Sequence, residues 1–260
     1  MAAVYYDGLG KDTQRESLKR IVKAELMGEF STLKYYDEDL SKEISYPITS
    51  VQKAVWMENT QLKENKILVK ESDDFYMLMG TTPQRTCLSY INGSYKECLL
   101  SGFDSNKKTL YAYMNGRIVG RAVIRLTKGR FDNPGDNASL AFVDLETSVT
   151  RNREMEKERL VLFLERPYSA GVPDETAGLI RDMYIALMTE KAKLIGAAFV
   201  VSDSYTGISL TNFTRTLFHI YISKSKAGEQ YLDSLKGSAK VSDEGGYREN
   251  RFYIHKNDIL

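Results

Sequence analysis

The chain has 260 residues, of which 42% are hydrophobic and 27% charged, and its formal net charge at pH 7 is +1. These proportions are typical of a soluble globular protein that can bury a core, as one large domain or as one domain with an extra lobe. The chain is not strongly basic or strongly acidic, so its net charge by itself indicates no binding partner.

Targeting and disulfide signals are missing from the sequence. The N-terminus lacks the basic flank and apolar stretch of a signal peptide, and the longest apolar run, residues 194–201, is too short to span a bilayer. The two cysteines, Cys87 and Cys98, cannot make a disulfide framework. We therefore expect a cytoplasmic protein without a membrane partner.

The cysteines and histidines give no metal motif. Cys87, Cys98, His219 and His255 are not spaced as C-x-x-C or H-x-x-x-H pairs, so we expect no metal site. A cysteine nucleophile with a histidine base is an alternative, but it has no local signature either.

Residues 1–72 are predicted to form a helical N-terminal region or lobe. Residues 13–30 open with a capping box and repeat apolar residues at helical spacing. Residues 49–63 open in the same way, with Thr49 and Gln52. Both helices are amphipathic, so each needs a surface to pack on, either in a small lobe or as the lid of a main domain.

Residues 73–260 are predicted to form a mixed α/β domain. A short strand and turn are expected from residue 75, and another strand within residues 139–149. The clearest local signal lies in residues 108–127, where Asn115-Gly116 separates two alternating, β-rich runs. That dipeptide is the preferred chemistry of a two-residue hairpin turn.

A strand–loop–helix–strand unit is predicted at the centre of this domain. Residues 159–165 read as a buried strand, a helix follows from its cap Asp174 to Gly196, and residues 197–202 read as a second buried strand. A strand, a crossover helix and a strand over about 40 residues imply a parallel pair of strands.

The C-terminal part leaves one element open. Residues 211–225 fit either a helix or a strand, and residues 238–258 read as two strands around Gly245-Gly246. The predicted fold class is therefore mixed α and β (α+β or α/β), with one central strand–loop–helix–strand unit.

This order of elements resembles the GNAT-type acyltransferase superfamily over about residues 105–255. Residues 115–126, "NGRIVGRAVIRL", look like the hairpin between its second and third strands. Residues 161–171, "VLFLERPYSAG", followed by residues 179–202, look like its cofactor-binding motif. The resemblance implies a GNAT-like mixed sheet and a site for coenzyme A or acetyl-CoA.

The family's pyrophosphate loop reads Gln/Arg-x-x-Gly-x-Gly/Ala, and Arg166, Ser169, Ala170 and Gly171 fit its spacing. Backbone amides in such a loop form a concave nest, and the N-terminus of the following helix adds positive dipole character. The sequence departs from the pattern because Ser169 replaces a glycine, and because "VPDE" brings two acids close to the expected anion. A third departure is His219, where the family's spacing places a tyrosine.

The resemblance further implies an acyl-CoA-dependent N-acyltransferase that acts on an unknown amine acceptor. Acyl transfer needs a base for the amine and an acid for the leaving thiolate. Glu146 and Glu165 lie on predicted strands, and either could be the base. Tyr205 or His219 could be the acid. For each of these residues a purely structural role is the alternative.

A different hypothesis comes from the charge pattern of residues 105–130, which hold seven basic residues and no acid. Three arginines alternate on one strand of the predicted hairpin, and two tyrosines lie on the facing strand. These residues are Arg117, Arg121, Arg125, Tyr111 and Tyr113. Such a face could make the chain a non-catalytic protein that binds nucleic acid or an acidic protein. The alternative is that this face is neutralised by acids elsewhere in the fold, such as those of residues 142–146.

Overall fold

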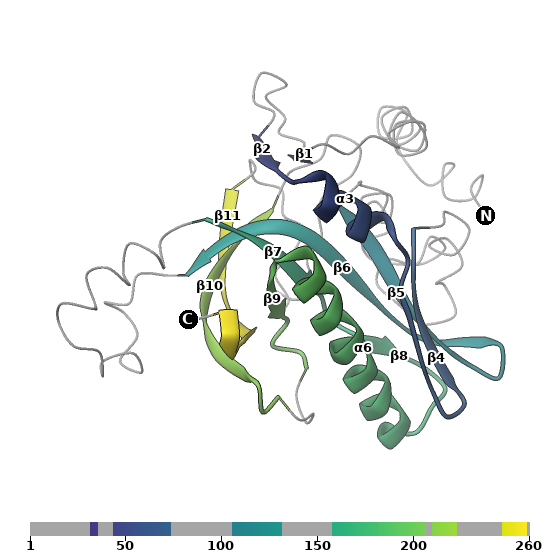
Figure 1. Ribbon diagram of the computed structural model, residues 1–260. Helices are drawn as coiled ribbons and strands as arrows, with labels where there is room; N and C mark the ends of the chain where they lie inside the picture. Colours follow the sequence, from purple (N-terminus) through teal and green to yellow (C-terminus); the bar gives the residue numbers. More distant parts are fainter. Residues whose placement is uncertain are drawn as a thin grey trace, which may run out of the picture.

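The structure is a computed structural model, whose described part combines a β-barrel with two α-helices (Figure 1). It describes residues 32–35, 44–73, 106–131, 158–205, 210–222 and 246–258. The predicted helix at 13–30, the strands from residue 75 and within 139–149, both cysteines and Gly245 lie outside the described residues.

Five strands close into a barrel in the order β6–β7–β9–β11–β10, and β10 returns to pair with β6. Their bounds are Arg117–Phe131 for β6, Arg159–Leu164 for β7, Ala198–Val201 for β9, Phe213–Ile222 for β10 and Gly246–His255 for β11. The β7–β9 pair is parallel and the other four pairings are antiparallel.

The barrel closes through the 15-residue strand β6, which pairs with β7 at its centre and with β10 at its end. Gly129 makes the second pairing possible. A Cβ atom there would lie 2.4 Å from the ring of Phe218 and 2.7 Å from the carbonyl oxygen of His219. Only a residue without a side chain lets β10 approach β6 so closely.

The sheet continues beyond the barrel on the other edge of β6. Strands β5 (Lys107–Met114), β4 (Ile67–Ser72) and β3 (Gln61–Glu64) follow in that order, and β8 (Tyr168–Ser169) also pairs with β6. Strands β1 (Thr32–Tyr35) and β2 (Ile44–Pro47) form a separate antiparallel pair.

Two hydrophobic clusters lie on opposite faces of the barrel strands. Alternate side chains of all five strands form the inner cluster, which includes Phe131, Phe163 and Phe252. The outer face carries α6 (Asp174–Ile195), and α3 (Ser50–Met57) packs beside it over the extended sheet (Figure 1). A 3-10 turn, Lys256–Asp258, follows β11.

The expectation of an open GNAT-type sheet is wrong, because β10 pairs with β6 and closes the barrel. The mixed α/β class is corrected as well. The described chain is mostly β, with α3 and α6 as its α-helices. The described part of residues 1–72 is not purely helical, because it holds β1 to β4 beside α3, and β4 pairs with β5.

Three finer expectations need adjustment. The helix predicted over 49–63 ends at Met57, because its C-cap Glu58 has an extended backbone (φ −66°, ψ 129°) and β3 begins at Gln61. The open element at 211–225 is strand β10, whose β-branched and aromatic side chains fill both clusters. Within 246–258, β11 is followed by a 3-10 turn.

The two local predictions are confirmed. Asn115 and Gly116 both have positive φ and join β5 to β6 in a two-residue hairpin. The strand–helix–strand unit is present as β7, α6 and β9. Helix α6 ends at Gly196 in the left-handed conformation, although its N-cap is Pro173 and Asp174 is its first residue.

Candidate functional site

The carboxyl ends of β7 and β9 form the first candidate site. The strands remain paired through a hydrogen bond from the Ser202 amide to the Leu164 carbonyl. Beyond it the chain after β7 turns toward β6, where the Glu165 amide donates to Val123 and β8 pairs at Gly120. The chain after β9 instead makes a tight turn at residues 202–205. We call this place, residues 165–171 and 202–205, the fork.

Such a fork is where ligands bind in many α/β proteins, because the carboxyl ends of two parallel strands part there beside a helix N-terminus. The helix here is α6, whose N-cap is Pro173 and makes no side-chain capping hydrogen bond. Gly171, just before it, has φ of 71° and open space around the position of a Cβ atom.

A buried ion pair lies at the base of the fork. Glu165, which is 5% exposed, accepts from Arg125 at 2.9 Å from Nε and 2.7 Å from Nη2. Removing either partner would leave a charge in a dry environment, so the pair fixes the position of the Glu165 carboxylate.

Two buried tyrosines interact electrostatically at this place: Tyr184 acts on Tyr205, and so does Glu165. Tyr184 on α6 is fully buried, and a Cβ atom at Gly120 would lie 3.0 Å from its hydroxyl oxygen. Gly120 therefore lets the hydroxyl reach the sheet. The Tyr205 hydroxyl is also fully buried and has no hydrogen-bond partner in the described part of the chain.

Burial raises the pKa of Tyr205 well above its usual value, and the pKa of Tyr184 is also raised, mainly by burial. The groups that act on Tyr205 electrostatically include Tyr184, Arg181 and Glu165. Both phenols therefore stay protonated at neutral pH, and each can donate a hydrogen bond.

The predicted loop residues all lie at the fork. Arg166 is exposed, with its guanidinium 5.8 Å from the centre of the Tyr168 ring. Ser169 pairs with Gly120, and the Ala170 amide donates to the Val119 carbonyl. These two pairings hold the loop against β6 and leave Gly171 as its open corner.

The four predicted catalytic residues do not come together. Glu165 and Tyr205 meet at the fork, whereas Glu146 lies outside the described residues. His219 pairs with Arg130, seven residues along β6 from the Val123 that contacts Glu165. At the rise of a β-strand, seven residues span about 23 Å along β6. His219 therefore lies near the end of β7 that is opposite to Glu165.

The basic hairpin is only partly on the surface. Arg117 is exposed, but Arg121 and Arg125 are 1% and 3% exposed. Tyr111, opposite Arg121, is buried, and Tyr113 is half-buried. In this conformation a nucleic acid cannot reach the two inner arginines, which serve the interior of the fold.

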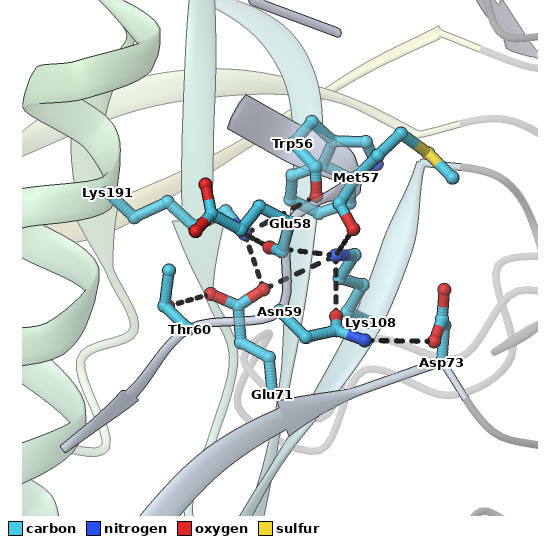
Figure 2. Close-up of polar contacts among 9 residues, drawn as sticks. All are labelled: Trp56, Met57, Glu58, Asn59, Thr60, Glu71, Asp73, Lys108 and Lys191. Atoms are coloured by element: carbon cyan, nitrogen blue, oxygen red, sulfur yellow. Dashed lines mark hydrogen bonds and ion pairs between the residues drawn. The ribbon is translucent and has the colours of Figure 1, made fainter. Parts of the chain in front are cut away.

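A second candidate site is a buried cluster of Glu71, Lys108 and Lys191 beneath the C-terminal end of α3 (Figure 2). No local pattern in the sequence indicates it, because the three residues come from β4, β5 and α6 and Glu71 is 120 residues from Lys191. The one available signal is weak: a lysine at position 191 falls within the buried stretch of α6.

Within the described ranges, no three His, Cys, Asp or Glu side chains gather as a metal site would require. The helices of this part of the chain are all too short or too polar to cross a bilayer. The sequence matches no protein-family model and no curated protein at a significant level.

Proposed function

We propose that the protein binds an acyl-coenzyme A at the fork and transfers the acyl group to an amine. The observation that carries the proposal is the Tyr205 hydroxyl, which is fully buried beside Glu165 and Tyr184 and has no hydrogen-bond partner in the described part of the chain. An unsatisfied buried donor at the carboxyl ends of parallel strands suits the oxygen or sulfur of a thioester.

The rest of the ligand fits the mouth of the fork. The first-turn amides of α6 have no side-chain cap, and Gly171 leaves space for a phosphate to approach. Arg166 adds an exposed positive charge on the same loop. Asp174 and Glu175 occupy the first turn itself, which favours a pyrophosphate on the Gly171 side.

The chemistry would divide between the two groups deepest in the fork. The amine nitrogen attacks the thioester carbonyl, the carbon–sulfur bond breaks, and one proton passes from the amine to the leaving sulfur. Glu165 is placed to accept the amine proton. Because burial raises the pKa of Tyr205, its hydroxyl suits a hydrogen bond to the developing oxyanion better than proton donation.

Two glycines that flank α6 give a matched test by calorimetric titration with acetyl-CoA. Gly171 and Gly196 both have φ of 71° and open surroundings, but they flank opposite ends of the helix. We expect Gly171→Glu to abolish binding, because it places bulk and negative charge at the phosphate position, and Gly196→Glu to leave binding intact. Absence of binding to the wild-type protein, or equal loss in both variants, would refute the proposal.

A further inference from the structure

The buried cluster holds the end of α3 through two ammonium groups (Figure 2). Lys108 donates to the carbonyl oxygens of Met57 and Glu58 at 3.2 and 3.3 Å and to Asn59 Oδ1 at 2.7 Å. Lys191 donates to the carbonyl oxygens of Trp56 at 3.4 Å and Glu58 at 2.8 Å, and to the Glu71 carboxylate.

These contacts replace an ordinary helix cap. The last carbonyl groups of a helix have no partner within it and carry partial negative charge. In α3 no basic residue lies in the last turn, and the two ammonium groups arrive instead from β5 and α6. They also lie 5.4 and 5.3 Å from the centre of the Trp56 ring, which is fully buried.

The cluster holds one more positive than negative charge in its buried part. The side chains of Lys108, Lys191 and Glu71 are at most 2% exposed, and Lys108 Nζ lies 3.5 Å from Glu71 Oε2. Thr60 donates to the other oxygen of Glu71. The remaining charged neighbours are Glu58 and Asp73, which are exposed at the rim and are screened by water.

Burial disfavours the excess charge, and losing one proton removes it. Burial, together with the neighbouring Lys191, lowers the pKa of Lys108 from 10.5 to about 8. Burial also lowers the pKa of Lys191. A neutral Lys108 still has two N–H groups, enough to keep Asn59 and one helix carbonyl bonded.

We propose that α3 is a proton-linked latch: when α3 is docked on the sheet, the Glu71–Lys108–Lys191 cluster binds one proton fewer in mildly alkaline solution than when α3 is undocked. Helix α3 lies between β2 and β3, so the latch decides how firmly this connection is held on the sheet. The sign follows from the charge count. Undocking exposes both lysines to water, and above about pH 8 it takes up a proton. The docking constant therefore rises with pH above about 8, and below this pH it stays constant at a lower value.

Trp56 reports this equilibrium directly, because it is the only tryptophan in the chain. Acrylamide quenching of its fluorescence measures how often water reaches the docked ring. Between pH 6.5 and 9.5 we expect the quenching constant of the wild-type protein to fall as the pH rises. The docking constant should increase about thirtyfold over this range, because its upper limit lies about 1.5 pH units above the pKa of the docked Lys108.

Two variants decide whether Lys108 is responsible. Lys108→Met keeps an apolar stem without the charge, and its quenching should not change with pH. Lys128→Met removes a lysine that pairs with Glu158 at 2.8 Å, outside the cluster, and should behave like the wild type. A pH-independent wild type, or a pH dependence that survives in Lys108→Met, would overturn the latch.

A second measurement on the wild-type protein covers the case in which Lys108→Met does not fold. In the NMR spectrum of protein carrying ¹³C-labelled lysine, the Cε signal of Lys108 should titrate near pH 8, below the ordinary range of a lysine. If every lysine titrates above pH 10 in the folded protein, the docked state holds its proton and the proposal is wrong.

Discussion

The Tyr205 hydroxyl group is fully buried at the fork and has no hydrogen-bond partner in the described part of the chain. Leaving a buried donor without a partner costs about 1–3 kcal/mol, because the group has lost its water and gained nothing in return. Most of the cluster around it is apolar, and a phenylalanine would fit the same space. A polar atom at such a position is explained if a ligand supplies its partner.

Tyr205→Phe should therefore separate stability from binding. We expect the free energy of unfolding of the unliganded protein to rise by about 1 kcal/mol, since an unsatisfied hydroxyl is removed, while acetyl-CoA affinity falls. Urea unfolding and calorimetric titration measure the two effects. Tyr221→Phe, which removes a buried hydroxyl from β10, should leave the affinity unchanged. A destabilised Tyr205→Phe protein with full affinity would show that the hydroxyl serves the fold alone.

Strand β6 is the element on which the architecture depends, because the barrel and the extended sheet share it. Gly129→Ala should destabilise the protein by about 1–3 kcal/mol, since the new methyl group meets the backbone of His219 as well as the Phe218 ring. In Gly178→Ala, on α6, the nearest atom is an Arg181 nitrogen 3.8 Å away. That variant should be stabilised by up to about 1 kcal/mol through helix propensity. Thermal unfolding of the pair tests this, and equal effects would contradict the closure.

Elements specified by neighbouring residues could be read from the sequence. The β5–β6 hairpin depends on Asn115-Gly116, and α6 on a long apolar stripe that ends at Gly196. The sequence-based helix extends to residue 63, because Leu62 falls at a helical spacing from the apolar residues before it. In the structure Leu62 is instead the half-buried residue of strand β3, and Asn65 forms the turn that follows this strand.

At the scale of the whole molecule, the features that the sequence could not predict are contacts between distant segments. Barrel closure pairs Phe131 with Phe218 and requires a residue without a side chain at Gly129. The hydrophobic periodicity of the sequence does not indicate this pairing. The burial of Arg121 and Arg125 follows from the same long-range packing, so a basic alternating strand looked like a surface. The cluster of Glu71, Lys108 and Lys191 likewise gathers residues from three separate elements, β4, β5 and α6, around the end of α3 (Figure 2).

The candidate site was partly predictable, because most of its residues lie within one local unit of the chain. The loop from Arg166 to Gly171 and the Glu165 carboxylate lie within one strand–loop–helix unit, which the sequence places correctly. Tyr205 joins them because β9 runs parallel to β7 and ends at the same edge. His219 could not be excluded without the register of β10 against β6.

The central claim, that the fork is a binding site, is tested most directly by hydrogen–deuterium exchange with and without acetyl-CoA. The account predicts slower exchange at residues 165–171, in the first turn of α6, and at residues 202–205, with no change in the hairpin around Gly116. Protection confined to the hairpin, or no protection at a saturating ligand concentration, would contradict it.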